Sequence, residues 1–331
     1  MNGHISRYGV DDRDHLVHFL RKFYKRFSAD GVQDERMTPQ TLGKNWSSFL
    51  YERYGKRFLC LFDGDDGSGG TPSDCKLNWT RFQNLIDHHR VDDYLIFKIQ
   101  FAPTSEQRMF YPFKRDVYPL ALMTNDPDRI FKIADELPKV EEDIDVLFVG
   151  GRVHDHNHPY CWPKNREKNQ HWPTNRRIGY AKLLEIKERR KDLNIVAIDQ
   201  LAKPDEYYNL VNRAKICLDF PGIGLSSRKF YEFAVMGKCI LSLDQNVSCI
   251  GYEAWEHYAS MGRDYTYTNL EHAIDHLVIM PSVRAELGRK AKSLRFKMSH
   301  EAVGQHVAVT LDGFVDSYFD ATLDSKRSIY E

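Results

Sequence analysis

The sequence predicts an α/β protein whose second half holds a parallel sheet covered by helices on both faces. Three observations indicate this fold class. Apolar runs alternate with helical patterns from residue 143 onward, which is typical of β/α units. Two further apolar strands are expected in the first half, at 57–62 and 93–101. The 331 residues are 42% hydrophobic and 28% charged, a globular composition in a chain long enough for two domains.

The first half opens with an amphipathic pattern at 14–27, which predicts a helix. Apolar side chains recur there at helical spacing, and basic residues lie on the other faces: Arg21, Lys22, Lys25 and Arg26. We interpret this segment as a surface helix packed on its own domain. A face that binds an acceptor or a membrane surface is the alternative.

The second half alternates strands and helices in a regular order. Strands are expected at 145–151, 193–199, 215–220 and 238–243, with helices between them at 175–190, 205–214 and 227–237. Ligands of such sheets bind outside the carboxyl ends of the strands. The loops that leave those ends are therefore where we expect functional residues.

Charge and cysteine content narrow the class of protein. Lys+Arg and Asp+Glu both number 47, so no net field draws the whole chain to nucleic acid or anionic lipid. The six cysteines lack C-x-x-C spacing, which indicates free thiols in a reducing compartment. The polar N-terminus has no signal-peptide pattern, and no apolar span is long enough to cross a membrane. We expect a cytoplasmic protein without a transmembrane segment.

The loop PGIGLSSRKFYEF, which follows the strand at 215–220, has the features of an anion site. Gly222 and Gly224 permit close approach of a ligand to the backbone, and Ser226 or Ser227 can cap the next helix. The free N–H groups of that helix favour a negative charge. Arg228 in its first turn adds donors suited to two phosphate oxygens.

Glu232 lies one turn after Arg228, on the same helix face. Its carboxylate suits a pair of sugar hydroxyls, and apolar residues follow it, so we expect it near the sheet. Phosphate and diol contacts together indicate a nucleotide sugar. The alternative is an i,i+4 surface pair between Arg228 and Glu232, with the serines acting only as caps.

A second polar loop leaves the first strand of this half. Arg152, directly after two glycines, is a candidate diphosphate contact, and Arg176 and Arg177 either assist it or cap the following helix. Histidines and an aspartate lie close together in this loop: His154, Asp155, His156 and His158. No zinc-binding spacing supports them as ligands, so we favour solvated or ligand-contacting histidines over a metal site.

A third loop, DGDDGSGG, follows the strand at 57–62. Its Asp63-Gly64-Asp65 matches the D-x-D pattern that chelates a divalent ion in one class of glycosyltransferases, but the phosphate site predicted above lies in the other half. Asp65 or Asp66 is instead a candidate general base for an acceptor hydroxyl. Turn-forming residues without a catalytic role are the alternative.

The stretch KICLDFPGIGLSSRKFYEFAVMGKCILSL resembles the donor-binding segment of GT-B glycosyltransferases, in their group-1-like and exostosin/spore-protein-like branch. A Gly/Ser loop, an arginine, a helix glutamate and a small residue before Gly-(Lys/Cys) recur there. DEYYNLVNRAKICLDF, DIDVLFVGGR and VYPLAL are similar to adjoining segments of the same fold, so the resemblance begins at Val117.

This resemblance implies an α/β fold of GT-B type, with two Rossmann-like domains facing across a cleft. The stretch LPKVEEDID has the composition of a connection between domains and places the boundary near Asp143. The domains would be an acceptor-side domain at 1–142, a nucleotide-sugar-binding domain at 143–299, and a helix within 300–331 that crosses back to the first.

The resemblance also implies that Glu232 contacts the donor ribose and Arg228 a donor phosphate. Retaining members often have two glutamates separated by seven residues, and Gly224 occupies the position of the first. The contact to the donor sugar and the stereochemical outcome are therefore left unassigned.

We therefore predict a glycosyltransferase that moves a sugar from a nucleotide-diphosphate donor, preferably a UDP-sugar, to an acceptor hydroxyl, without a metal or other cofactor. A glycan, a lipid-linked molecule or a small molecule fits as acceptor. The alternatives are a phage-type enzyme acting on a modified DNA base, a non-catalytic nucleotide-sugar-binding regulator, and a sugar-phosphate epimerase.

Overall fold

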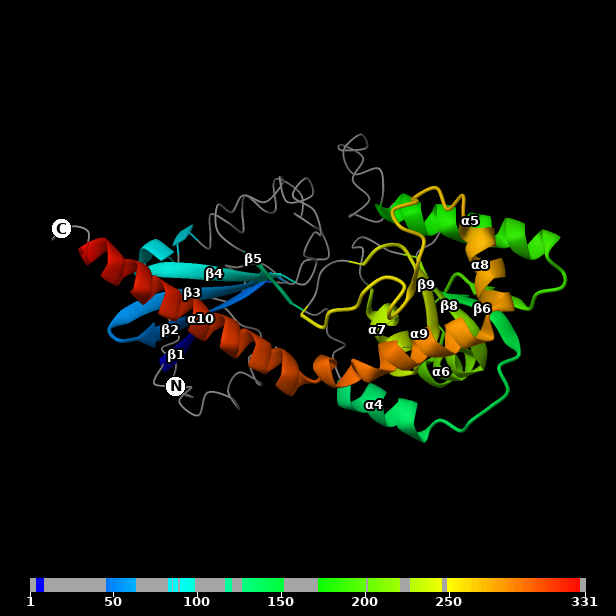
Figure 1. The fold of residues 1–331 in the computed structure, drawn as a ribbon, viewed down its shortest axis with the longest axis horizontal. Coiled ribbons are helices and arrows are strands. Elements are labelled where there is room, and N and C mark those ends of the chain that lie inside the picture. Colours follow the sequence, from blue (N-terminus) through cyan, green and yellow to red (C-terminus); the bar gives the residue numbers. More distant parts are fainter. Residues whose placement is uncertain are drawn as a thin grey trace. The chain divides into compact units, whose positions relative to one another are not determined.

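The computed structural model describes much of the chain (Figure 1). The described residues are 4–8, 46–63, 83–84, 86–88, 90–98, 117–120, 127–151, 172–200, 202–220, 227–245 and 249–327. Backbone contacts divide the chain into two compact units. Unit 1 comprises Met1–Ala121 and Ser299–Glu331, and unit 2 comprises Leu122–Met298.

Unit 1 contains a five-stranded mixed sheet in the order β1-β2-β3-β4-β5. Its strands are β1 (His4–Tyr8), β2 (Trp46–Arg53), β3 (Lys56–Asp63), β4 (Asp93–Lys98) and β5 (Val117–Pro119). β1, β2 and β3 pair antiparallel, whereas β3, β4 and β5 pair parallel. The strands predicted at 57–62 and 93–101 are confirmed as β3 and β4.

A two-residue turn joins β2 to β3. Tyr54 and Gly55 both have positive φ, at 52° and 74°, and the flanking Arg53 pairs with Lys56. A turn with positive φ at both central residues matches the twist of a hairpin. The sequence prediction missed β2 because its residues, WSSFLYER, form no continuous apolar run.

The long helix α10 (His300–Arg327) belongs to unit 1 and packs on this sheet. The rings of Phe314 and Tyr318 lie edge-on to the buried Phe58, at centroid distances of 6.3 and 5.2 Å. The hydroxyl of buried Tyr51 donates a hydrogen bond to Asp312 Oδ1 at 3.3 Å. The apolar stripe of α10 therefore covers part of the core of unit 1.

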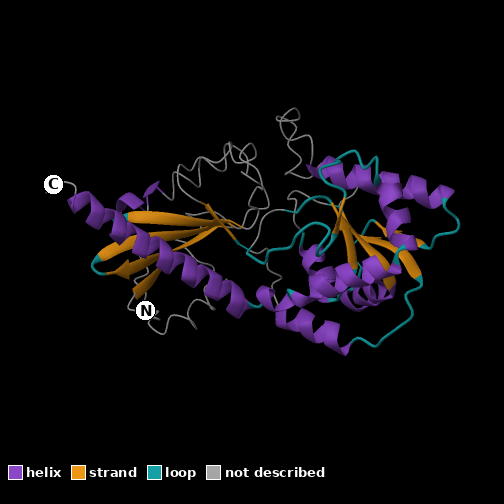
Figure 2. Ribbon diagram, in the orientation of Figure 1, coloured by secondary structure: helices purple, strands orange, loops and turns teal. Residues whose placement is uncertain are grey.

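Unit 2 contains a parallel sheet, drawn as orange arrows in Figure 2. Its five strands follow the order β10-β9-β8-β6-β7. The strands are β6 (Ile144–Val149), β7 (Ile195–Ile198), β8 (Ala214–Asp219), β9 (Cys239–Ser242) and β10 (Ala259–Ser260). The parallel sheet predicted for the second half is thereby confirmed.

Helices cover both faces of this sheet. They are α4 (Pro127–Glu136), α5 (Trp172–Arg189), α6 (Pro204–Arg213), α7 (Arg228–Val235), α8 (Leu270–Ile279) and α9 (Pro281–Ser293), followed by the 3₁₀ turn η3 (Arg295–Met298). α5 and α8 lie together on one face, and α6, α7 and α9 lie on the other (Figure 1). α4 packs against α7.

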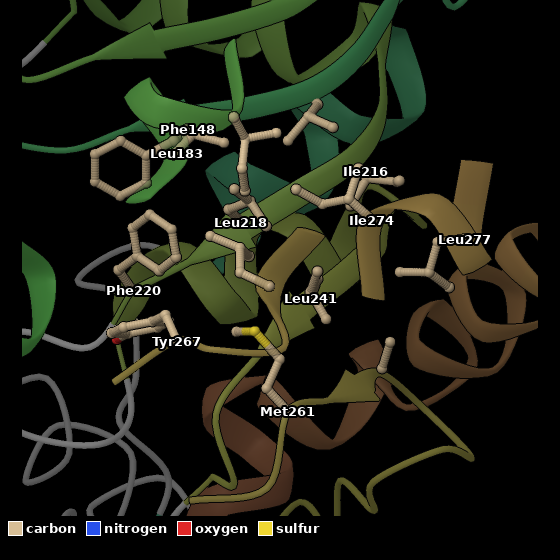
Figure 3. Close-up of a cluster of buried hydrophobic side chains, with 14 of the residues drawn as sticks. Phe148, Leu183, Ile216, Leu218, Phe220, Leu241, Met261, Tyr267, Ile274 and Leu277 are labelled. Carbon is tan, nitrogen blue, oxygen red and sulfur yellow. The ribbon is translucent and has the colours of Figure 1, made fainter. Parts of the chain in front are cut away.

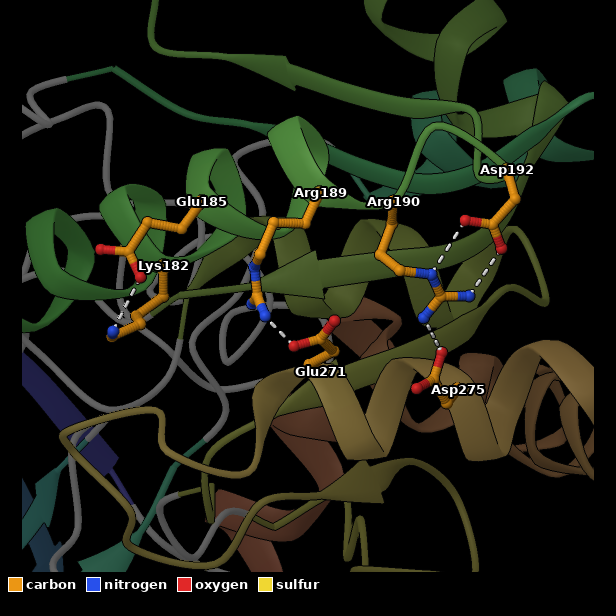
Figure 4. A network of polar contacts seen from close by, with 7 residues as sticks. All are labelled: Lys182, Glu185, Arg189, Arg190, Asp192, Glu271 and Asp275. Carbon is orange, nitrogen blue, oxygen red and sulfur yellow. Dashed lines mark hydrogen bonds and ion pairs between the residues drawn. The ribbon is translucent and has the colours of Figure 1, made fainter.

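The core beneath α5 and α8 is built from alternate residues of the strands (Figure 3). Side chains of successive strand residues point to opposite faces, so every second residue faces these helices. The buried cluster includes Val146, Phe148, Ile216, Leu218, Phe220, Leu241, Leu183, Ile274 and Leu277. Ion pairs at the surface join the end of α5 to α8: Arg189, the last residue of α5, pairs with Glu271, and the next residue, Arg190, pairs with Asp275 (Figure 4).

The start of unit 2 lies ahead of the boundary expected near Asp143. The polar stretch at 137–145 is tied to unit 2, since Asn212 Nδ2 donates to Pro138 O at 2.8 Å and Lys238 Nζ to Glu142 Oε1 at 2.7 Å. α4, which precedes it, packs on α7 of the same unit. The predicted helix at 14–27 lies outside the described residues.

Candidate functional site

The carboxyl ends of β6 and β8 form the point where the order of the parallel sheet reverses. From β6 the chain continues to β7 on one side, and from β8 it continues to β9 on the other. The loops that leave these two neighbouring strands therefore diverge, and such switch points are where ligands bind in open α/β sheets. The predicted phosphate loop follows β8, and the Arg152 loop follows β6.

Ser227 begins the helix that follows β8. It is the N-cap of α7, with an extended backbone and a side-chain oxygen that accepts the Phe230 N–H at 3.3 Å. The same hydroxyl donates to Asp219 Oδ1 at 2.6 Å. Capping by Ser227 was one of the two options that the sequence allowed. The cap fixes the first turn of α7 beside the end of β8, where helix N–H groups favour an anion.

Asp219, the last residue of β8, is fully buried. Besides the bond from Ser227, its side chain and backbone carbonyl accept from Ser242 Oγ at 3.5 and 3.1 Å. Gln245 Nε2 in turn donates to Ser242 Oγ at 2.7 Å. This network joins the ends of β8 and β9 and orients the Asp219 carboxylate.

Lys229, the second residue of α7, reaches the end of β6. Its Nζ donates to Val149 O at 2.7 Å and lies 4.9 Å from the centre of the Phe148 ring. The fit against Gly150 is close, because a Cβ added there would lie 2.6 Å from Nζ. Burial of the ammonium, together with the nearby charge of Arg176, lowers the pKa of Lys229 to about 7.

Arg176, near the start of α5, bridges the two strand ends. Its Nε donates to Phe220 O and its Nη1 to Gly151 O, both at 3.2 Å. Gly179, one turn further along, lets α5 approach the sheet, since a Cβ there would lie 2.8 Å from the Phe220 ring. The sequence left open whether Arg176 assists the site or caps α5; in the structure its guanidinium lies at the switch point.

Tyr267 brings an unsatisfied polar group to the same place. Its side chain is 1% exposed, its ring packs edge-on to Phe220 at 5.0 Å, and its φ of 55° is unusual for a residue other than glycine. Among the described residues, its hydroxyl has no hydrogen-bond partner. Burial and the nearby Asp219 carboxylate raise the pKa of this hydroxyl.

Glu232 lies one turn into α7 and is half-buried, as expected, whereas Arg228 is exposed. Burial raises the pKa of the Glu232 carboxyl, while the Tyr207 hydroxyl, Lys229 and Arg228 lower it. The Tyr207 hydroxyl lies near this carboxylate without meeting hydrogen-bond geometry, and it is buried. Glu232 is therefore held in a partly dry environment beside positive charge.

Several predicted site residues lie outside the described residues: Asp65, Asp66, Arg152, Gly222, Gly224 and Ser226, together with His154, His156 and His158. The structure brings Ser227, Arg228 and Glu232 together on α7. It adds residues at the switch point that the sequence did not single out: Asp219, Lys229 and Tyr267. Helical spacing gave a signal for Lys229, which shares a face of α7 with the fully buried Phe233.

Within the described ranges, no group of three or more His, Cys, Asp or Glu residues is placed to hold a metal ion. In the same ranges, Cys60, Cys217 and Cys239 are buried free thiols. None of the helices described has the length and apolar character needed to span a bilayer.

Comparisons with known proteins found distant structural similarity and no match in sequence. No protein family profile matches the chain, and no curated protein matches it. Among solved structures, it is similar to a sucrose-phosphate synthase from Thermosynechococcus elongatus, with a TM-score of 0.39 and 12% sequence identity. The similarity covers 73% of this chain and 62% of that one, so the chain spans less than two thirds of that structure.

Proposed function

We propose that this protein is a glycosyltransferase that binds a nucleotide-diphosphate sugar at the carboxyl ends of β6 and β8. One observation carries the proposal. The capped N-terminus of α7 lies at the switch point of a parallel sheet, and the half-buried Glu232 follows Arg228 by one turn. Helix amides and Arg228 suit a diphosphate, and Glu232 suits the two hydroxyls of a ribose.

In this reaction the bond between the anomeric carbon of the donor sugar and the diphosphate oxygen breaks. A new bond forms to an acceptor hydroxyl oxygen, whose proton passes to a base, for which we propose Asp65 or Asp66. The leaving diphosphate gains negative charge as the bond breaks. The α7 amides, Arg228 and Arg152 would stabilise that charge, and we expect them to replace a metal ion.

We propose a UDP-sugar as the first donor to test, and a glycan, a lipid-linked molecule or a small molecule as acceptor. Arg228 supports a phosphate contact because it lies exposed in the first turn of α7, where it is free to reach a ligand. Glu232 supports the ribose contact because partial burial favours a hydrogen bond to a hydroxyl over full solvation.

The test is a thermal-shift screen of the wild type and of Arg228→Ala and Glu232→Ala with UDP-, GDP-, ADP- and TDP-sugars, with and without EDTA. A ligand that binds only the folded state raises the melting temperature by mass action. We expect one nucleotide family to stabilise the wild type, with EDTA making no difference, and both variants to lose the shift. Unchanged shifts and unchanged turnover in both variants would contradict the proposal.

A further inference from the structure

Lys229 differs from Lys215 and Lys238, two other lysines at the strands of unit 2, in lacking a carboxylate partner among the described residues. Lys238 pairs with Glu142 at 2.7 Å, and Lys215 pairs with Asp145 at 2.7 Å. Within the part of the chain that the structure describes, the contacts of the Lys229 ammonium are a carbonyl oxygen and an aromatic ring. Burying a charge without a partner is costly, so this position needs another explanation.

The charged groups that face Lys229 do not neutralise it. Arg176 on α5 opposes its positive charge, whereas Asp219 on β8 and Glu232 on α7 favour it. The Asp219 carboxylate is already engaged by hydroxyls of Ser227 and Ser242. An anion brought to this place would therefore find two cationic side chains, Lys229 and Arg176, at the ends of neighbouring strands.

Tyr267 gives a second, independent indication of a ligand. Its hydroxyl is buried and has no partner among the described residues, and it lies close enough to Asp219 and Arg176 to feel their charges. A buried donor without a partner destabilises the folded protein, because the hydrogen bonds that it made to water are not replaced. Its φ of 55° adds backbone strain, which tends to persist at functional sites.

We propose that Lys229 takes up a proton from solvent when a phosphoryl group binds at the ends of β6 and β8, and that its ammonium then contacts a phosphoryl oxygen. This inference rests on the proposed function, because it deepens the same diphosphate site. Lys229 is then a binding residue that becomes positively charged when the ligand binds, and Arg176 and Tyr267 lie at the same strand ends.

The pH dependence follows from the pKa of about 7 for Lys229 in the ligand-free protein. A bound phosphate dianion favours the ammonium and so raises this pKa. Below about pH 7 both states carry the proton, and affinity stays constant. Above it, the free protein loses the proton that the complex keeps, so affinity falls by up to about tenfold per pH unit until the pKa of the complex is reached.

The experiment is titration calorimetry of the full chain with UDP, GDP, ADP and TDP between pH 7 and pH 9. This range lies above the second phosphate ionisation, near pH 6. Two buffers of different ionisation enthalpy report the protons taken up at each pH. Lys229→Gln carries an N–H donor, as the lysine does, but no charge. Lys229→Met is a second uncharged variant, for use if the buried glutamine amide impairs folding. Lys215→Gln, at the opposite end of the sheet, is the matched control.

We expect the wild type and the Lys215→Gln variant to take up a substantial fraction of one proton per ligand, with Kd rising as pH rises. Lys229→Gln should bind at least about tenfold more weakly at pH 7 and show a flat pH profile. A Lys229 variant that keeps the wild-type Kd and pH profile would overturn the inference and leave the proposed function standing. A wild type that binds none of the four diphosphates would overturn both.

Discussion

The two ends of the parallel sheet in unit 2 differ in whether their charged and polar side chains have partners. At the amino end, acidic side chains at and just before β6 pair with basic side chains of neighbouring segments: Glu142 with Lys238, Asp143 with Arg213, and Asp145 with Lys215. At the carboxyl end, the Lys229 ammonium and the Tyr267 hydroxyl have no such partners among the described residues.

This difference distinguishes the residues that stabilise the fold from those that we propose bind a ligand. Paired charges at the amino end tie the connection before β6 to β8 and β9 and leave little for a ligand to bind. Unsatisfied groups at the carboxyl end lower the stability of the ligand-free protein, and a ligand can recover that cost. Substitutions at the amino end should therefore lower stability, whereas substitutions at the carboxyl end should weaken ligand binding.

The largest loss of stability is expected where the carboxyl end of α7 packs against α9, at the amino end of the sheet. Gly237, with φ of 71°, ends this helix, and a Cβ at Gly288 of α9 would lie 2.1 Å from Gly237 O. Gly288→Ala must push α9 away from this turn, so it should cost about 3 kcal/mol or more, measured by urea denaturation. Gly313→Ala, on an exposed and open part of α10, is the matched control and should stabilise by about 0.5–1 kcal/mol. Equal effects at the two glycines would show that α7 is not anchored here.

Replacing Lys238 or Lys229 by Met should change the stability of the ligand-free protein in opposite directions. Lys238→Met removes bonds to Glu142 Oε1 at 2.7 Å and Asn212 O at 2.5 Å, and should destabilise by about 1–3 kcal/mol without changing nucleotide affinity. Lys229→Met removes an unpaired buried ammonium, and should raise the melting temperature of the ligand-free protein while weakening nucleotide binding. Melting curves of both variants at pH 7, with and without the stabilising nucleotide, compare the two effects.

The gain from Lys229→Met should also depend on pH. The pKa of Lys229 is lower in the folded protein than in the unfolded chain, so between about pH 7 and pH 10 the unfolded state binds more protons. Wild-type stability at this site therefore rises with pH over that window. The advantage of Lys229→Met should be full at pH 7 and shrink toward pH 10. An advantage that stays constant over this range would mean that Lys229 is not the group that titrates.

Local sequence patterns were sufficient to predict most of the strands and helices of unit 2. Buried strands such as KICLDF and CILS are continuous apolar runs, and the helices between them have clear periodicity, so both types of element were predicted close to their observed bounds. On α7, the position of Ser227 as cap and the half-buried state of Glu232 also follow from neighbouring residues. These features depend on residues only a few positions apart.

The rest of the site depends on contacts between distant segments. Lys229 lies 80 positions from Val149 in sequence, and Arg176 lies 44 positions from Phe220. Nothing near Tyr267 in the sequence indicates that its hydroxyl is buried near Asp219. Only the strand order β7-β6-β8, which the sequence does not specify, brings these residues together.

A crystal structure of the full chain with bound UDP, or with whichever nucleoside diphosphate stabilises it best, tests the central claim most directly. The account predicts phosphate density at the carboxyl ends of β6 and β8, within hydrogen-bond distance of the first N–H groups of α7 and of Lys229 Nζ. Phosphate density on another surface, with Lys229 still bonded only to Val149 O and Tyr267 still without a partner, would contradict it.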